Sequence, residues 1–253
     1  MTRGQWGIIV VTRRQLAVFF FVAGLIAGAW SALFSGKDLA ASVTPAAPVR
    51  PELSLDQPVR EVPSAEGMMA LTINVDWGND ELVEMLDILD QYAVKATFFL
   101  TGRWARAFPD LAREIASRGH EIGNHGLSHA HPTQLSRKQL TEMIAANTQV
   151  LEQATGVRPV PLFAPPYGEQ NHRVVQVAAE LGYFTTLWTL DTIDWQEPPP
   201  DTILGRVVPR ARHGAIVLMH PKPQTVEALP RMIEGLQEKG FRLVPLWQMM
   251  QAE

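Results

Sequence analysis

The chain has 253 residues, a net charge of −4, 46% hydrophobic residues and 19% charged residues. This composition is typical of a globular protein, and the length suffices for one domain with a sizeable core or two small ones. The charge balance gives no reason to expect nucleic acid as a partner, and the absence of cysteine excludes disulfides, a thiolate nucleophile and Cys-ligated zinc.

The first predicted element is a membrane-spanning helix over Leu16–Phe34. Its nineteen residues include no charge, and in a helix they span about 28 Å, close to the hydrocarbon thickness of a bilayer. Arg13 and Arg14 precede the segment, so the positive-inside rule directs the rest of the chain out of the cytoplasm. The alternative is a cleaved signal peptide, because small residues follow at Ala40 and Ala41. The expected location is therefore the cell membrane with a single pass, or secretion if the helix is cleaved.

A proline-rich linker is predicted between this helix and the rest of the chain. Residues 42–64 contain five prolines and no apolar periodicity, which is typical of an extended spacer. The expected organisation is a cytoplasmic N-terminus at residues 1–15, the membrane helix at 16–34, the linker at 35–66 and a folded domain at 67–253.

From Gly67 onward, short apolar runs alternate with longer amphipathic stretches, which predicts parallel βαβ units. Seven such units indicate an α/β fold, a distorted and incomplete (β/α)7 TIM-like barrel, with an open doubly wound sheet as the alternative. In both folds the functional site lies at the carboxyl ends of the strands. The predicted strands are Met68–Val75, Lys95–Leu100, His120–Asn124, Val160–Ala164, Phe184–Leu190, Ala215–Met219 and Phe241–Leu246. The predicted helices are Asp80–Tyr92, Pro109–Arg118, Arg137–Thr155, Arg173–Leu181, Asp201–Arg212 and Thr225–Lys239.

Polar clusters follow five of the predicted strands. Because parallel strands end at the same edge of a sheet, these clusters are expected to meet in one site. They are Thr72–Gly78, Asn124–His129, Phe163–Gly168, Asp191–Trp195 and Leu218–Pro221.

The histidine pair His125 and His129 is the candidate metal site. Two histidines four residues apart can meet one ion from a single helical turn or a tight loop. Together with Asp76 they would form a set of two imidazoles and one carboxylate, which leaves coordination positions for water and substrate. Such an open site is typical of a metal that acts as a Lewis acid rather than of a structural metal.

His220 is the candidate general acid, since it follows a buried apolar run and could protonate a leaving amine. A carboxylate partner is expected to raise its pKa, and Asp191, one strand away, is the candidate. For Asp194, a capping role and a functional role are equally well supported.

Three further features belong to the same predicted site. Trp195 and Leu218 could form an apolar slot the size of a methyl group. The turn Pro165-Pro166 fixes the backbone that follows it, so the Tyr167 N–H could serve an oxyanion hole.

Together these residues resemble the polysaccharide deacetylase pattern (NodB homology, carbohydrate esterase family 4), over about Met69 to Leu246. The sequence is most similar to the sporulation-type deacetylases of Gram-positive bacteria. The segments that carry this likeness are Val75–Gly78, Lys95–Phe99 and the run from His220 to Pro230.

The resemblance implies a distorted barrel of the NodB fold and a divalent metal, Zn²⁺ first, with Co²⁺, Ni²⁺ or Mn²⁺ as alternatives. It implies removal of acetyl groups from N-acetylglucosamine or N-acetylmuramic acid units of a peptidoglycan-like or chitin-like glycan. Carried over residue by residue, His125 and His129 bind the metal, Tyr167 supplies the oxyanion N–H, Asp191 tunes the acid His220, Trp195 and Leu218 line the acetate pocket, and Asn74 and Pro166 lie against substrate.

Two positions depart from the family pattern. The first motif usually has adjacent aspartates, a base and a metal ligand, whereas here Asn74 stands at the base position and Val75 precedes Asp76. The arginine that usually holds the base is Ala164 here. Asparagine cannot usefully accept a proton from water near neutral pH, which leaves three accounts of the chemistry.

In the first account, Asp76 acts as ligand and base, or only as base while the two histidines hold the metal. In the second, the metal activates water and another group takes the proton. In the third, catalysis is lost and the protein only binds cell-wall glycan. The presence of the acid pair favours an enzyme over a binding protein, and an O-acetyl esterase on the same fold is a further alternative.

Overall fold

The structure is a computed structural model that describes residues 48–251. Eight strands lie within this range, and the paired strands run parallel in the order β5-β4-β3-β2-β1-β7-β6, with β8 on β1. They are β1 (Met68–Val75), β2 (Thr97–Leu100), β3 (Glu121–Asn124), β4 (Leu162–Phe163), β5 (Phe184–Thr185), β6 (Leu190–Asp191), β7 (Ile216–Met219) and β8 (Arg242–Leu243). The predicted strand Phe184–Leu190 is thus two short strands, and the incomplete parallel barrel is confirmed.

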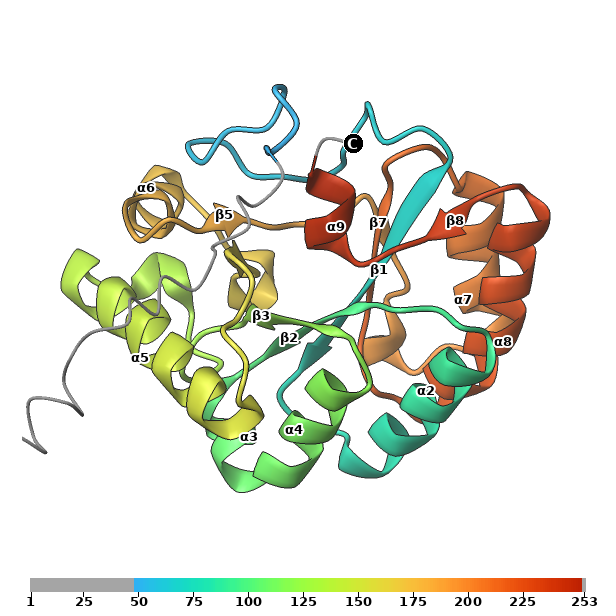
Figure 1. The fold of residues 1–253 in the computed structure, drawn as a ribbon, viewed down its shortest axis with the longest axis horizontal. Helices are drawn as coiled ribbons and strands as arrows, with labels where there is room; N and C mark the ends of the chain where they lie inside the picture. Colours follow the sequence, from blue (N-terminus) through green and yellow to red (C-terminus); the bar gives the residue numbers. More distant parts are fainter. Residues whose placement is uncertain (1–47, 252–253) are drawn as a thin grey trace, which may run out of the picture. The chain divides into compact units, whose positions relative to one another are not determined.

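The helices lie around the outside of these strands except for α9, which lies near the middle of the view in Figure 1. They are α2 (Asn79–Gln91), α3 (Gly102–Ala107), α4 (Pro109–Ser117), α5 (Arg137–Thr155), α6 (His172–Glu180), α7 (Pro200–Val207), α8 (Pro223–Glu238) and α9 (Leu246–Met250). Single 3-10 turns are η1 (Pro132–Gln134), η2 (Pro166–Gly168), η3 (Asp194–Gln196) and η4 (Val208–Arg210). Six of these helices correspond to predicted ones, whereas α3 and α9 are too short to show a helical period in the sequence.

Strand β1 sends its side chains alternately to two buried compartments. Met69, Leu71, Ile73 and Val75 join the core beneath α2, α4, α7 and α8, whereas Met68 and Ala70 join the core inside the barrel. Side chains two apart on a strand share a face, so Thr72 and Asn74 also face the barrel interior. Both are buried, at 3% and 7% exposed.

Helix α9 fills the interior at the amino ends of the strands. Its first N–H groups donate hydrogen bonds to the side chains of the first residues of β2 and β3. Leu246 N–H donates to Thr97 Oγ1 (2.8 Å), and Trp247 N–H donates to Glu121 Oε2 (2.8 Å). Burial raises the pKa of the Glu121 carboxyl. Because this end is plugged, the open space in the barrel lies at the carboxyl ends of the strands.

The second half of the predicted linker is part of the folded unit, which spans residues 47–253. Val59 pairs with Thr186 after β5, and Glu61 pairs with Ala215 before β7, so this segment bridges strands β5 and β7. Val59 and Val62 are 4% and 0% exposed. Residues from Val49 onward therefore pack with the predicted domain, because apolar residues interrupt the prolines and bury themselves in the interior core.

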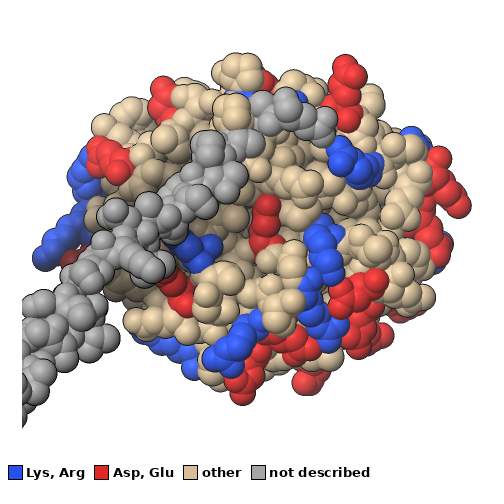
Figure 2. Space-filling view, viewed as in Figure 1, with Lys and Arg blue, Asp and Glu red and all other residues tan. Residues whose placement is uncertain are grey.

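Within the described range, no helix combines the length and apolar character needed to cross a membrane. The predicted membrane helix at Leu16–Phe34 lies outside the described residues. On the face shown in Figure 2, acidic and basic side chains lie interspersed.

Close packing between β2 and β3 predicts a stability difference between two glycine substitutions. An alanine Cβ at Gly123 would lie 2.5 Å from ring atoms of buried Phe99, whereas at Gly205 in α7 no atom lies within 4 Å. Gly123→Ala should lower the free energy of unfolding by about 1–3 kcal/mol through overpacking. Gly205→Ala should raise it by about 0.5–1 kcal/mol through helix propensity. Urea unfolding measures both, and equal effects would contradict the packing described.

Candidate active site

A cavity of about 450 Å³ opens at the carboxyl ends of the strands. It gathers side chains from all five of the polar clusters that follow the strands in the sequence. Its lining is Asn74, Trp77, His125, His129, Tyr167, Gly168, Trp188, Asp191, Trp195, Leu218 and His220. The expectation that these clusters converge is therefore confirmed.

His125 and His129 lie together in this cavity. Their ring centroids are 5.2 Å apart, and His125 is 1% exposed. His125 Nδ1 lies 2.7 Å from the Ala164 carbonyl oxygen, to which it donates as the neutral tautomer, so Nε2 keeps its lone pair. Burial, with the neighbouring charge of His129, lowers the pKa of His125 to about 3. Burial also lowers the pKa of His129, so both rings are suited to act as neutral ligands.

Asp76 lies beside the histidines, but its carboxylate is bound by another element. Oδ1 accepts from Thr101 Oγ1 (2.7 Å) and from Arg103 Nε (2.6 Å), while Oδ2 pairs with Arg103 Nη2. Burial acts to raise the pKa of Asp76, but the hydrogen bonds from Arg103 and Thr101 outweigh it, and the pKa is lowered. The carboxylate is thus ionised and already paired with a cation.

The residues as arranged do not fit the divalent metal that the resemblance implies. Among residues 48–251, no three or more His, Asp or Glu side chains come together in a way that could hold a metal ion. The predicted ligand set of Asp76, His125 and His129 is therefore not assembled. The reason is that Arg103 occupies both oxygens of the carboxylate that the set requires.

The Trp77 side chain lies in the same region of the cavity, against two of the histidines. Its ring stacks on His220, with centroids 5.7 Å apart and planes 11° apart, and meets the edge of His129 at 6.1 Å. The indole therefore forms a wall that touches both histidines.

His220 forms the acid pair of the site with Asp194. His220 Nδ1 lies 2.7 Å from Asp194 Oδ1, and Asp194 Oδ2 accepts from the His220 N–H (2.6 Å) and from Thr225 Oγ1 (2.8 Å). The Asp194 side chain is 0% exposed. Burial acts to raise its pKa, but the hydrogen bonds and charge of His220 together with Thr225 lower it overall. This leaves Nε2 of His220 for the cavity.

The predicted partner of His220, Asp191, is corrected to Asp194. Asp191 lines the cavity, but its Oδ1 accepts from the Ile193 N–H (2.8 Å), and burial raises the pKa of its carboxyl. Ile193 adopts a left-handed conformation at φ 50°, which turns the chain so that Asp194, not Asp191, reaches His220.

Tyr167 and the cavity wall follow the expected arrangement in part. Tyr167 has φ 61° in the turn η2, and its hydroxyl donates to the His129 carbonyl (3.3 Å). Trp195 and Leu218 line the cavity as predicted, with Trp195 55% exposed at its rim. Pro166 is buried within the turn and lies outside the cavity lining, so it supports the turn rather than contacting a ligand there.

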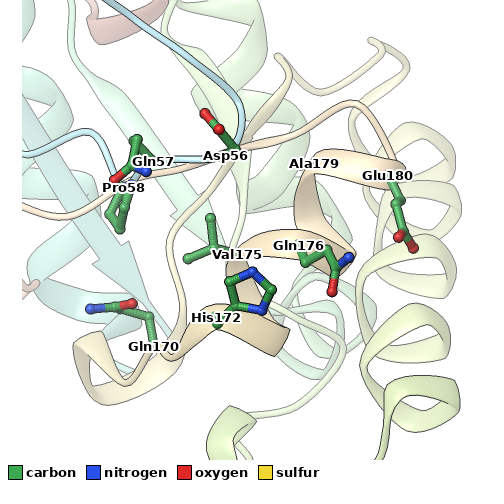
Figure 3. A pocket seen from close by; sticks show the side chains of 9 residues that line it. All are labelled: Asp56, Gln57, Pro58, Gln170, His172, Val175, Gln176, Ala179 and Glu180. Atoms are coloured by element: carbon green, nitrogen blue, oxygen red, sulfur yellow. The ribbon is translucent and has the colours of Figure 1, made fainter.

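A second cavity of about 600 Å³ lies between residues 56–58 and α6. Figure 3 labels the side chains that line it, among them His172, Gln176 and Glu180 of that helix. Although this cavity is larger, it contains none of the residues that the sequence assigns to chemistry. The site is therefore placed at the carboxyl ends of the strands.

Sequence reasoning missed Arg103, Trp77 and Trp188 as parts of the site. Arg103 follows β2, the one early strand to which no polar cluster had been assigned, although Thr101 and Arg103 stand at its end. The strand-end rule applied to β2 would have found it. Trp188 lies on the loop between β5 and β6, inside a stretch that was predicted to be strand.

Similarity to known proteins agrees with this site. A family model described as polysaccharide deacetylase matches residues 61–186. A peptidoglycan-N-acetylglucosamine deacetylase of Bacillus cereus is 34% identical, over 75% of this chain and 91% of that protein. The crystal structure of BA3943, described as a CE4 family pseudoenzyme from Bacillus anthracis, is 40% identical with a TM-score of 0.75, over 79% of this chain and 70% of that one. A mutant of BA3943 with restored enzymatic activity is 38% identical, with a TM-score of 0.75, over 79% and 72% of the two chains.

The buried Asp194 predicts a pH dependence of stability. Its pKa is lower in the folded state than the ordinary value of 3.8, so its stabilisation is complete above that value and is lost as pH falls through the folded-state pKa. Asp194→Asn should destabilise the protein by about 1.5–3 kcal/mol at pH 7, and the difference from wild type should shrink below pH 4.

Thermal unfolding of both proteins between pH 7 and pH 3 measures this difference. Asp201→Asn is the control, because Asp201 pairs with Arg231 on the surface and is 79% exposed, so its loss should cost little at any pH. A difference for Asp194→Asn that stays constant down to pH 3 would contradict the predicted linkage.

Proposed function

The chain belongs to the polysaccharide deacetylase family, carbohydrate esterase family 4, and from that premise we propose that it binds the N-acetylated sugars of a cell-wall polysaccharide and deacetylates them only slowly. The observation that carries this proposal is the cavity, in which the binding walls and the acid pair are intact while the base and metal positions are altered. A peptidoglycan-like glycan is the expected substrate class.

The binding half of the proposal is supported by the shape and lining of the cavity. Trp195 is 55% exposed, and Leu218, at 5% exposed, lines the same cavity. Together they offer a small apolar slot for an acetyl methyl group, and aromatic faces bury large areas of a flat apolar ligand surface. His220 and Asn74 supply the polar contacts that orient such a ligand.

The slow reaction follows from the catalytic groups at the strand ends, where a general acid is present and a general base is missing. His220, oriented by Asp194, can protonate a departing amine through Nε2. At the end of β1, however, the side chain in the cavity is Asn74, which cannot accept a proton from water, and Asp76 is held by Arg103. Loss of a general base costs about 10²–10⁴ in rate, and the altered metal position adds to that loss.

A metal-dependent deacetylase with ordinary turnover is the second candidate. It is favoured by the neighbouring His125 and His129 and by the intact His220–Asp194 pair. It requires Asp76 to leave Arg103, or a metal to be held by the two histidines alone. Rapid acetate release by wild-type protein, abolished by chelation and by His125→Ala, would favour it over the proposal made here.

We also propose that the Leu16–Phe34 segment holds this domain at the outer side of the cytoplasmic membrane, where a cell-wall glycan lies. This rests on the sequence alone. Fractionation and protease treatment of intact cells test it: a protein that stays in the cytosol contradicts the proposal, and one released into the medium indicates that the segment is cleaved.

Restoring a carboxylate in the cavity should restore chemistry. We predict that Asn74→Asp raises the rate of acetate release from acetylated chitooligosaccharides at least tenfold, because a carboxylate at this point can take a proton from water. Acetate is measured enzymatically, with and without added Zn²⁺, and with O-acetylated glycan in parallel to detect esterase activity.

Asn74→Ala is the matched control, because it also removes the amide but adds no base, and it should give no gain in rate over wild type. A loss of activity in Asn74→Asp would instead indicate that Asp76 is already the working base and that the proposal of slow turnover is wrong.

Glycan binding should depend on the aromatic rim. Trp195→Ala should weaken binding of chitotetraose about tenfold, which corresponds to ~1.4 kcal/mol, since it removes one wall of the slot. Isothermal titration calorimetry measures the affinity. Phe108→Ala is the control, because Phe108 is an exposed aromatic at 37% that lies outside the cavity lining. Equal affinities for wild type and Trp195→Ala would rule out binding in this cavity.

A further inference from the structure

Asp76 and Arg103 form an ion pair in which the carboxylate is buried and the arginine is exposed. The Asp76 side chain is 2% exposed, whereas that of Arg103 is 57% exposed. Arg103 therefore approaches a buried carboxylate from the solvent side and covers it. Both Asp76 oxygens are engaged, Oδ1 also by Thr101. A planar guanidinium that meets two carboxylate oxygens in this way makes a strong and directional contact.

The backbone of Arg103 is fixed to the loop that carries the histidines. Gly102 N–H donates to the Gly126 carbonyl (3.1 Å), and Arg103 N–H donates to the Leu127 carbonyl (2.9 Å). Helix α3 starts here because Thr101 caps it, accepting from the Trp104 N–H. A Cβ on Gly102 would lie 2.5 Å from Asn147 Oδ1, so the start of α3 is packed tightly against α5. The backbone that carries the Arg103 side chain is therefore attached to the loop that carries His125 and His129.

Arg103 also carries its positive charge next to the loop of the histidine pair, since its N–H donates to the Leu127 carbonyl of that loop (2.9 Å). Like charges repel, so a guanidinium at this loop opposes the approach of a divalent cation to the ring nitrogens of the histidines. At the same time the guanidinium pairs with Asp76, the carboxylate that the predicted ligand set requires.

From this geometry we propose that Arg103 is a built-in counter-ion that takes the place of a divalent metal beside Asp76 and keeps the His125/His129 site from binding one. The Asp76 carboxyl group is buried, and the chain supplies a cation for it in Arg103. The two histidines alone are then a weak site, because two neutral ligands leave most of a divalent ion's coordination and charge unsatisfied.

The proposal predicts that metal affinity is gained when Arg103 is removed. In the metal-stripped protein, Arg103→Ala and Arg103→Met should each bind one Zn²⁺ at least tenfold more tightly than wild type, measured by isothermal titration calorimetry with ZnCl₂. Arg103→Met keeps the aliphatic bulk, so a folding defect specific to the alanine variant leaves the test intact. Circular dichroism and thermal unfolding establish that each variant is folded.

Two further variants assign the gain to the proposed residues. The double variant Arg103→Met/Asp76→Asn should return to the wild-type affinity, because the freed carboxylate is gone. Arg106→Ala is the matched control, since it removes an exposed arginine from the same helix and changes the net charge equally. It should leave Zn²⁺ affinity unchanged.

Three outcomes would overturn the proposal. These are wild-type affinity for Zn²⁺ equal to that of the Arg103 variants, an equal gain in Arg106→Ala, and a gain that persists in the double variant. The readout is metal binding rather than glycan binding or acetate release. A negative result therefore leaves the proposed function standing, and failure to bind glycan leaves this inference standing.

Discussion

The alternation of side chains along β1 is the constraint on which the site depends. Because β1 is buried on both faces and lies between β2 and β7, every second residue must serve the barrel interior and the others the helical layer. Asn74 therefore reaches the cavity and Val75 does not, whatever chemistry either position would favour. The next residue, Asp76, leaves the strand and falls within reach of the element that follows β2. A change of one residue in register here exchanges a cavity residue for a core residue.

The sequence predicted the fold well because its longest strand and its longest helix each show a clear pattern of apolar residues. Met68–Val75 and Arg137–Thr155 were predicted with the bounds that the structure has, since a continuous apolar run and a nineteen-residue helical period are both unambiguous. The short strands β5 and β6 were merged because two residues each carry no period. The buried part of the Pro-rich segment was taken for a spacer, because single valines between prolines give no pattern that reveals burial.

The candidate site was predictable as a location and less so as a set of contacts. The strand-end rule brought the five polar clusters together, but it does not say which side chain meets which. His220 was expected to meet Asp191, yet a left-handed isoleucine at position 193 moves the partner to Asp194. A non-glycine residue at positive φ has no sequence signature. Likewise, the reach of Arg103 to Asp76 depends on where α3 starts, which one Thr cap and one tightly packed glycine decide.

The position of helix α9 in the barrel affects the order in which parts of the domain can fold. The Glu121 carboxylate and the Thr97 hydroxyl, at the starts of β2 and β3, are satisfied by N–H groups of residues 246–248, which are synthesised more than a hundred residues later. Two neighbours of β1, β7 and β8, are likewise synthesised more than a hundred residues after it. A nascent chain therefore holds a carboxylate without its donors and an interior without its plug. The barrel interior therefore closes only when residues 246–248 reach it, which makes closure depend on contacts between residues far apart in the sequence.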